Sequence, residues 1–381
     1  MSTTNGIQGQ TNIVSNLQRT AAFMTEVLGL RLAKRAVHPH DERIACMEFG
    51  FDGQSTQRLT FLEWSPIFYA LPAEGLTSAA ATRAALDHPR VGDFKGRWGA
   101  GTNHHVALHV SSREGLLKWK RRLIDHGVHV TGPYFRNYFN AVYFRDPDGA
   151  ILEIATTEPG FAYDEEVLGS THQKPKDGAM VGSRSEADVA AETWPEPVPE
   201  VTDDMRLRGL HHITSVSSDI ERTTEFWVER VGLHLIKRTD YLDQEGGTHY
   251  YFSAIEDVAP GHVLTYFGFP GFESGRLGVG LSHHFTLAVA DDDSLHDVCE
   301  RLKKSRIAVG DLEDHGDSRA VTFRDPDGHL CQLATTRAEA VAAESNGRLV
   351  LPEHLEHRRD AVERALALRA APTSAAAVED I

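Results

Sequence analysis

Cysteine is scarce in this chain, which has three among its 381 residues. Cys46, Cys299 and Cys331 are too few and too scattered for a disulfide framework or a cysteine-based zinc site. A reducing cytoplasm is therefore the expected compartment. Long apolar runs are also missing, and the polar segment Met1–Gln10 lacks the core of a signal peptide, so we expect no membrane partner.

Positive charge is in deficit as well. The 55 Asp and Glu residues outnumber the 39 Lys and Arg residues, which gives a formal net charge of -16. A nucleic acid partner would require clustered basic residues, so this class of function is not expected. What the chain does have is the length for about two or three domains. It also has 21 histidines, a generous number that prompts a search for metal ligands.

The most informative feature is a repeat. The segment Asn103–Val110 (NHHVALHV) recurs as Ser282–Val289 (SHHFTLAV), and Phe144–Gly149 (FRDPDG) recurs unchanged as Phe323–Gly328. Both pairs have the same offset, with no gap between the blocks. The chain is therefore a duplicated domain, and divergence between the copies can indicate where chemistry has been kept.

Each half divides again, because Gly6–Leu30 matches Gly209–Leu233. The four units share one order of a strand, a helix and further strands, and the Asp-Gly turn of each FRDPDG segment predicts a hairpin. We therefore expect an α+β fold of four βαβββ units arranged as two tandem domains. The expected parts are an N-terminal domain at residues 1–157, an acidic Pro- and Gly-rich linker that wraps over the surface at 158–205, a C-terminal domain at 206–340 and a helical, Ala-rich tail at 341–381.

Two segments fall outside this pattern. Residues 70–101 form a long insertion between the first two units, where a partial lid is expected. The tail contains one segment with helical periodicity, at about Glu353–Arg369.

Histidines and a carboxylate stand on strands of the second and third units. Side chains alternate along a strand, so His212 and Thr214 should share one face while His211 takes the other unless the strand end is twisted. His105 and His109 should share a face in the same way, with His109 interpreted as a core histidine, and Glu153 lies on the last strand of the second unit. Two histidines and one carboxylate form the facial triad that holds a divalent ion, most typically Fe(II).

The repeat indicates which residues can form such a triad. The matched positions are His105 and His284, Glu153 and Gln332, and His212 and Gly9. A site that combines the second and third units has all three ligands, whereas a site from the first and fourth units has lost one imidazole and one charge. Pairing within a half leaves both sites incomplete. We therefore predict a metal site of His105, Glu153 and His212, built across the two halves.

These motifs together resemble a known family. Leu210–Thr214 (LHHIT), NHHVALHV, FRDPDG and Ile151–Thr156 (ILEIAT) are similar to motifs of the vicinal oxygen chelate superfamily. More narrowly, they resemble its ring-cleaving extradiol dioxygenases of the hydroquinone type. The resemblance implies two tandem vicinal oxygen chelate domains. It also implies an iron centre whose ligands are the second His of each pair and the Glu, taken from opposite halves. The usual order is inverted here, since LHHIT stands in the third unit and the Glu in the second.

The resemblance also implies catalytic roles for four side chains near the metal. Tyr143 and Arg136 stand at the positions where the family tends to have a Tyr and an Arg before the Glu, and His211 and Thr214 are the first His and the Thr of LHHIT. Tyr143 or His211 would handle a phenolic proton, and Arg136 would stabilise negative charge. The positions that match Tyr143 and Arg136 in the other copy hold Thr322 and His315, which supply neither a phenol nor a guanidinium.

The function implied is an Fe(II)-dependent dioxygenase that inserts O2 into a small hydroquinone or catechol-type ring, with Mn(II) as a second metal that the same ligands can hold. Two alternatives exist on the same fold. A glyoxalase-like isomerase or lyase usually needs a second carboxylate at the metal, and a non-catalytic small-molecule binding protein normally lacks the triad. The sequence leaves open which ring substituents are accepted and whether the chain forms a homo-oligomer.

Overall fold

The structure is a computed structural model that describes residues 4–38, 41–51, 55–64, 95–256, 258–314 and 318–336. The expected tail helix, the rest of the tail, His315 and residues 70–94 of the expected lid lie outside these described residues. No helix in the described ranges is long and apolar enough to cross a membrane.

The N-terminal half contains two βαβββ units. The first consists of β1 (Thr4–Val14), α1 (Leu17–Ala22) with its π-helical continuation η1 (Phe23–Val27), β2 (Arg31–His38), β3 (Asp41–Gly50) and β4 (Arg58–Glu63). The second consists of β5 (Asn103–Val110), α4 (Arg113–Asp125), β6 (Val130–Phe135), β7 (Phe139–Arg145) and β8 (Ile151–Pro159). Asn16 and Ser112 cap the two helices, because each side chain accepts a hydrogen bond from a backbone N–H of the first turn.

The C-terminal half repeats this order. The third unit consists of β10 (Leu210–Ser217), α6 (Ile220–Glu225) with the π-helical η4 (Phe226–Val231), β11 (His234–Asp240), β12 (Thr248–Ser253) and β13 (Val263–Gly268). The fourth consists of β14 (Ser282–Val289), α7 (Asp292–Lys304), β15 (Glu313–Asp314), β16 (Ser318–Arg324) and β17 (Leu330–Thr336). The predicted α+β fold of four βαβββ units is confirmed.

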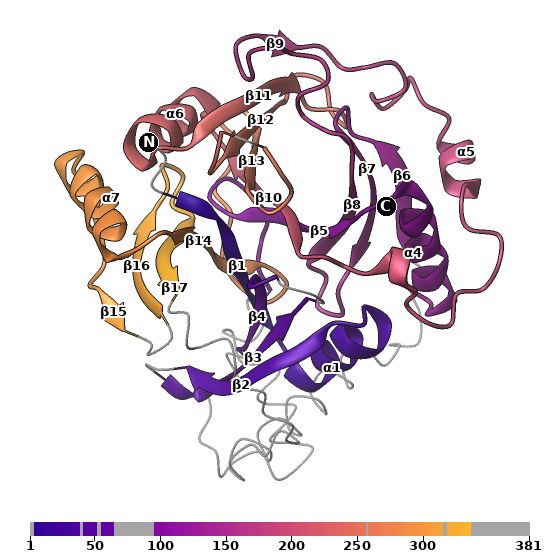
Figure 1. Ribbon diagram of the computed structural model, residues 1–381, viewed down its shortest axis with the longest axis horizontal. Helices are drawn as coiled ribbons and strands as arrows, with labels where there is room; N and C mark the ends of the chain where they lie inside the picture. Colours follow the sequence, from indigo (N-terminus) through magenta and orange to yellow (C-terminus); the bar gives the residue numbers. More distant parts are fainter. Residues whose placement is uncertain are drawn as a thin grey trace, which may run out of the picture.

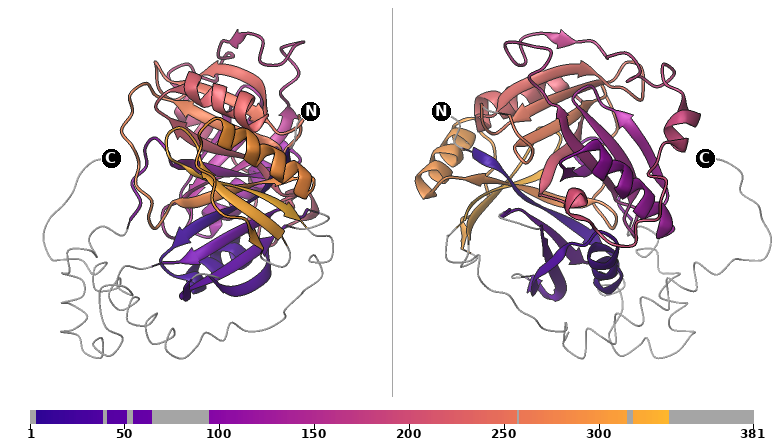
Figure 2. Two further views of the ribbon diagram at one scale, coloured as in Figure 1. Left: turned by 90° about the vertical axis from the view of Figure 1, so that its left-hand side faces the viewer. Right: turned by 45° about the vertical axis from the view of Figure 1, so that its right-hand side comes forward.

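Strands from opposite halves share each sheet (Figure 1). One sheet has the order β6-β7-β8-β5-β10-β13-β12-β11-β9 and joins the second and third units. The other has the order β15-β16-β17-β14-β1-β4-β3-β2 and joins the fourth and first units. In the turned views of Figure 2, the yellow and orange strands of the fourth unit lie beside the indigo strands of the first. The fold itself therefore supplies the pairing across halves that the predicted site requires.

The helices α1, α4, α6 and α7 lie on the outside of the two curved sheets (Figure 1). Their apolar sides pack on the outer sheet faces, where Trp119 and Trp227 are fully buried in the main core. A second, smaller apolar cluster lies on the other face of the nine-stranded sheet and includes Tyr138, Phe139 and Tyr251. This inner face surrounds the candidate site.

The junction of β5 and β10 contains two β-bulges. Leu210 pairs with Leu108 and His212 with Ala107, so His211 is an extra residue in β10. At the other end Thr214 pairs with His105 and Ser215 with Asn103, so His104 is an extra residue in β5. A bulge re-aims side chains that would otherwise alternate between faces. Both histidines of each pair therefore lie on the inner side of the sheet, and the expectation that His211 takes the opposite face is wrong.

The second Asp of each FRDPDG turn joins the two units of its half. Asp148 accepts hydrogen bonds from the backbone N of Ser15 at 2.9 Å and its hydroxyl at 2.6 Å, and pairs with Arg19 at 2.7 Å. In the other half Asp327 has the same three partners, namely the N and hydroxyl of Ser218 and the guanidinium of Arg222. These two carboxylates therefore link the two units of each half in addition to shaping the turn.

Replacing Asp148 with Ala is expected to lower the free energy of unfolding by about 1–3 kcal/mol, because buried donors on Ser15 lose their acceptor. Urea unfolding measures the change. Asp327→Ala should cost a similar amount, and Asp203→Ala, whose side chain is 92% exposed, should cost less than about 0.5 kcal/mol. Equal small changes in all three variants would contradict a joining role.

The segment expected to be a surface linker is partly built into the nine-stranded sheet. Its strand β9 (His172–Gln173) pairs with β11, and it continues into α5 (Glu186–Ala191) and the short helix η3 (Asp203–Met205). Phe161 and Ala179 are buried, so the segment does not merely wrap over the surface.

Candidate metal centre

The three predicted ligands come from adjacent strands of the nine-stranded sheet. Glu153 on β8 pairs with Ala107 on β5, and Ala107 pairs with His212 on β10. The small alanine leaves room for its two neighbours to approach each other across β5. His105 lies two residues before Ala107 on the same face and completes the group.

The ligand atoms are close enough to share one ion. Oε2 of Glu153 lies 2.8 Å from Nε2 of His105 and 3.5 Å from Nε2 of His212, and the two nitrogens lie 3.3 Å apart. Three ligands on one face of an octahedral ion, each about 2.1 Å from it, would stand roughly 3 Å apart. Neither oxygen of the fully buried Glu153 accepts a regular hydrogen bond from the described residues. This donor set and its unsatisfied carboxylate fit a divalent metal.

Electrostatics favour the ligand forms of these groups. Burial alone would raise the pKa of Glu153, but the attraction of the neighbouring His212 and His105 outweighs this effect and holds that pKa well below its usual range. Burial lowers the pKa of His105, an effect that Glu153 only partly opposes. A carboxylate and a neutral imidazole are the forms that bind metal ions.

Each ligand histidine is held by the histidine that precedes it. Nδ1 of His211 lies 2.8 Å from Nδ1 of His212, and Nε2 of His211 lies 3.1 Å from the carbonyl oxygen of Thr156. If His211 donates to that carbonyl, its Nδ1 accepts from His212, whose Nε2 lone pair then faces the metal position. Nδ1 of His104 lies 2.7 Å from Nδ1 of His105 and supports it in the same way.

A phenol and a guanidinium stand over the ligands. Tyr143 pairs directly with Glu153 across β7 and β8, and Arg136 donates from Nε to its hydroxyl oxygen at 3.0 Å. Asp243, from the loop after β11, holds Arg136 at 2.8 Å. Burial keeps the pKa of Tyr143 well above its usual value although Arg136 opposes this, so the phenol stays protonated. Because its oxygen accepts from Arg136, its own hydrogen is available to a ligand.

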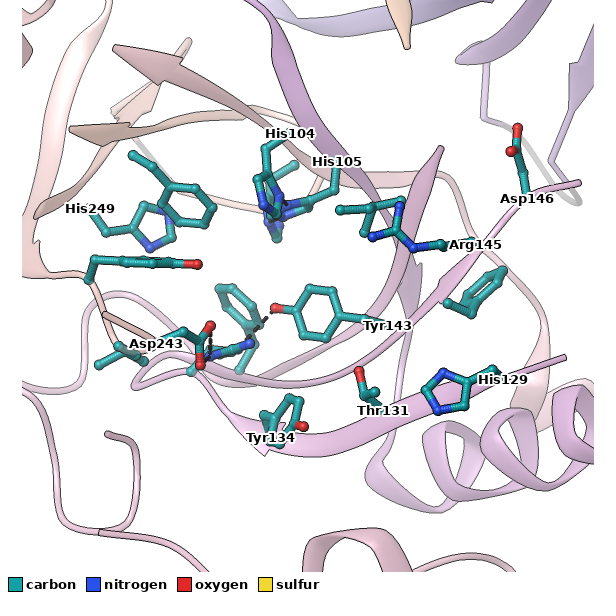
Figure 3. A pocket seen from close by; sticks show the side chains of 18 of the residues that line it. His104, His105, His129, Thr131, Tyr134, Tyr143, Arg145, Asp146, Asp243 and His249 are labelled. Atoms are coloured by element: carbon teal, nitrogen blue, oxygen red, sulfur yellow. Dashed lines mark hydrogen bonds and ion pairs between the residues drawn. The ribbon is translucent and has the colours of Figure 1, made fainter. Parts of the chain in front are cut away.

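A pocket of about 770 Å³ opens beside these groups. Figure 3 shows His104, His105 and His249 on one side and Tyr143 pointing toward them, with Asp243 at one end and His129 and Arg145 at the other. Phe139 and Phe267 add apolar walls next to the histidines. The volume lies within the usual range for small-molecule sites. The arrangement can hold a small aromatic molecule against an ion.

The matching position in the other sheet is filled differently. Thr286 replaces Ala107 between the strands, and its hydroxyl donates to the side-chain oxygen of Gln332 at 2.9 Å. A Cβ atom on Gly9 would lie 2.6 Å from the carbonyl oxygen of Arg58, so a histidine does not fit there without a backbone shift. His284 remains, with Thr11 as its neighbour at 3.3 Å. Among the described residues, one group of three such side chains is close enough for a metal.

The structure brings together His105, Glu153 and His212, with Tyr143 and Arg136 at the pocket. His211 and Thr214 are buried and do not line the pocket. His109 lies outside the group and bonds Thr157 at 2.7 Å.

Sequence reasoning missed several polar side chains that line the pocket, and four of them are His104, Arg184, Asp243 and His249. Only His104 carried a signal, since the adjacent His-His pair occurs on the first strand of three of the four units.

Comparison with known proteins places this geometry in a family. The model of the Glyoxalase/Bleomycin resistance protein/Dioxygenase superfamily matches residues 9–154 and 209–333. Two Bacillus subtilis (strain 168) proteins share similar stretches. The protein named "Putative ring-cleaving dioxygenase MhqO" is 46% identical over 89 residues, which are 22% of this chain and 28% of that protein. The one named "Putative ring-cleaving dioxygenase MhqA" is 42% identical over 151 residues, 32% of this chain and 46% of that protein. Each match spans less than half of the relative.

Solved structures share the whole fold. A crystal structure described as a "putative dioxygenase from Bacillus subtilis subsp. subtilis str. 168" has a TM-score of 0.64 and 22% identity, covering 96% of this chain and 97% of that one. Glyoxalase I from Zea mays has a TM-score of 0.53 and 16% identity, covering 87% of this chain and 92% of that one. At such identities these two show the fold alone. The family model covers most of the sequence, and on that ground the chain belongs to the Glyoxalase/Bleomycin resistance protein/Dioxygenase superfamily.

Proposed function

We propose that this protein is an Fe(II)-dependent dioxygenase that cleaves a hydroquinone or catechol-type ring with O2. The observation that carries the proposal is the group of His105, Glu153 and His212 beside a pocket large enough for an aromatic substrate. Three protein ligands leave coordination positions for a substrate oxygen and for dioxygen. The names of the Bacillus relatives support this reaction class, and Mn(II) is the second metal that the same donors accept.

Iron held by these residues would supply a Lewis acid for a deprotonated ring oxygen and a path for an electron toward O2. The protein contributes position and charge. His104 and His211 fix the ring orientation of the two histidine ligands through their Nδ1 contacts. Phe139 and Phe267 flank the site, where they exclude water and present apolar faces to an aromatic ring.

Tyr143 acts as the acid of the site in this proposal. Its raised pKa keeps the phenol protonated at neutral pH, so it can donate to a negatively charged oxygen rather than remove a proton from a neutral one. Arg136 stabilises negative charge on the bound ring, since its guanidinium is fixed by Asp243 and by stacking over Tyr134 and Tyr143, each ring centre 4.9 Å away. His211 lies off the pocket wall with both ring nitrogens engaged, so we assign it to ligand positioning.

Oxygen uptake tests the proposal. Protein purified without oxygen and loaded with Fe(II) is expected to consume O2 when a hydroquinone or a catechol is added, with a new absorbance band from the opened ring. Tyr143→Phe and Arg136→Met should each lower kcat about 100-fold or more. Thr322→Val, the matching change in the other copy, should leave kcat unchanged.

A lack of oxygen uptake across panels of both substrate types, with Fe(II) or Mn(II), would sink the dioxygenase assignment. Turnover of a thiol adduct with nickel or zinc and no oxygen uptake would point instead to a glyoxalase-like isomerase.

A further inference from the structure

A row of polar side chains leads away from the candidate metal centre across three strands. The hydroxyl oxygen of Thr214 lies 2.9 Å from Nε2 of His105 and 2.7 Å from the hydroxyl oxygen of Thr265. The Thr265 oxygen lies 2.9 Å from Nε2 of His249. Nδ1 of His249 lies 2.8 Å from the hydroxyl oxygen of Tyr251. The four residues form one continuous hydrogen-bonded chain that ends at a ligand.

The strand register explains how this hydrogen-bonded row of side chains forms. Thr214 on β10 pairs with Thr265 on β13, which in turn pairs with Tyr251 on β12. His249 shares a face with Tyr251 because the two are two residues apart. Both threonines are 0% exposed, Tyr251 is 1% and His249 is 7% exposed. Polar groups so deeply buried in an otherwise apolar wall cost free energy unless their hydrogen bonds are made.

The direction of hydrogen-bond donation along this row of side chains follows from its far end, at Tyr251. Among the described residues, the Tyr251 hydroxyl has His249 as its hydrogen-bond partner and no other, so it donates to Nδ1. Burial raises the pKa of Tyr251 well above its usual value and lowers that of His249, so both are neutral. His249 then carries its proton on Nε2 and donates to Thr265. Thr265 donates to Thr214, which leaves the Thr214 hydrogen directed at the metal centre.

The other sheet provides a comparison within the same chain. Thr11 pairs with Thr60 on β4, as Thr214 pairs with Thr265, so both threonines are retained. Cys46 and Glu48 on β3 occupy the positions of His249 and Tyr251, since Glu48 pairs with Thr60 as Tyr251 pairs with Thr265. The imidazole and phenol that give the chain its direction therefore occur only beside the complete ligand triad.

We propose that Tyr251, His249 and Thr265 are positioning residues that fix the Thr214 hydroxyl as a hydrogen-bond donor to an oxygen atom held at the metal. This inference deepens the proposed function and rests on its metal site. When Nε2 of His105 binds a metal, Thr214 loses that acceptor, and a negatively charged oxygen ligand becomes the acceptor for its hydrogen. Successive donors polarise one another, which strengthens the last hydrogen bond.

The tautomer of His249 in metal-free protein tests the direction of hydrogen-bond donation from Tyr251 to Thr214. Imidazole 15N NMR is expected to show His249 protonated on Nε2. Within the described ranges Tyr251 is the donor to Nδ1, so Tyr251→Phe should shift the tautomer toward Nδ1–H, whereas Tyr250→Phe should not. Tyr250 is the matched control because its hydroxyl bonds Glu221 on the opposite face of β12. Finding the Nδ1–H form in the unmodified protein would overturn the proposal.

An anion at the metal tests where the donor points. Azide should bind Co(II)-loaded protein, followed by the visible absorption of cobalt, about 10-fold more weakly in Thr265→Val than in the unmodified protein. Thr265→Ser should restore the affinity, and cobalt content should be equal in all three. Unchanged azide affinity in Thr265→Val would refute the proposed donor. Both readouts are independent of ring cleavage, so failure of the dioxygenase assay and failure of this inference can be told apart.

Discussion

Replacing Glu153 with Gln is expected to abolish metal retention, whereas replacing Gln332 with Ala is expected to leave it intact. Glu153 supplies the one negative charge of the ligand group, and its two oxygens have no regular hydrogen bond among the described residues to stabilise them otherwise. A neutral amide keeps the shape but not the charge, so metal affinity should fall more than about 100-fold. Metal analysis after dialysis against a weak chelator measures this loss.

Gln332 is the matched control because it occupies the equivalent position on β17. Its side chain accepts from Thr286 instead of facing a ligand set, so Gln332→Ala should cost about 1 kcal/mol of stability and no metal. The unmodified chain should bind one equivalent. Equal metal loss in the two variants, or two equivalents per chain, would show that metal binding is not confined to the site of the second and third units.

The repeat made the fold and the pairing of halves predictable from sequence. The FRDPDG turns and the His-His strands define four units, and the loss of ligands at Gly9 and Gln332 leaves only one complete combination. That combination requires β5 and β10 to be neighbours, and the sheet order places them so. The argument worked because a metal site needs all its ligands, so divergence between two copies is informative.

The orientation of paired histidines could not be predicted in the same way. Strict alternation sends His211 and His104 to the outer face, but the bulges at these positions turn both inward. A bulge depends on how two strands from opposite halves align, which no local pattern in either strand reveals. The bulge recurs at His283 in the other sheet, so it follows from the packing of the repeat rather than from the metal site alone.

The pocket wall was the least predictable part. Asp243 comes from a loop, and Arg184 comes from the segment expected to be a surface linker. Arg184 lies 3.1 Å from Asp243 and over the ring of Tyr134, so the linker helps to fix Arg136 through their shared carboxylate. Composition alone gives a Pro- and Gly-rich acidic stretch no reason to be part of a site.

Replacing Lys237 with Met is expected to lower the free energy of unfolding by about 3–5 kcal/mol. The Lys237 side chain is 0% exposed, and its Nζ lies 2.7 Å from Asp164 and 2.9 Å from Glu165 of the linker segment. Methionine preserves the apolar stem but leaves the largely buried Glu165 without this cation, while Asp164 keeps Lys176 at 2.8 Å. Since this cluster fastens the segment that carries Arg184, the variant should also be cleaved faster by protease between residues 160 and 185.

Neutralising the two acidic partners of Lys237 separates the cost of unpaired charge from the cost of lost packing, and urea unfolding measures both. Adding Asp164→Asn and Glu165→Gln to Lys237→Met should recover much of the lost stability, because no unpaired charge then remains buried. The matched control is Lys303→Met, whose side chain is 56% exposed and pairs with Glu300 at 3.4 Å, and it should cost less than about 0.5 kcal/mol. If the triple variant were no more stable than Lys237→Met, the loss would come from packing around the stem. The linker would then be held by its apolar contacts at Phe161 rather than by this ion cluster.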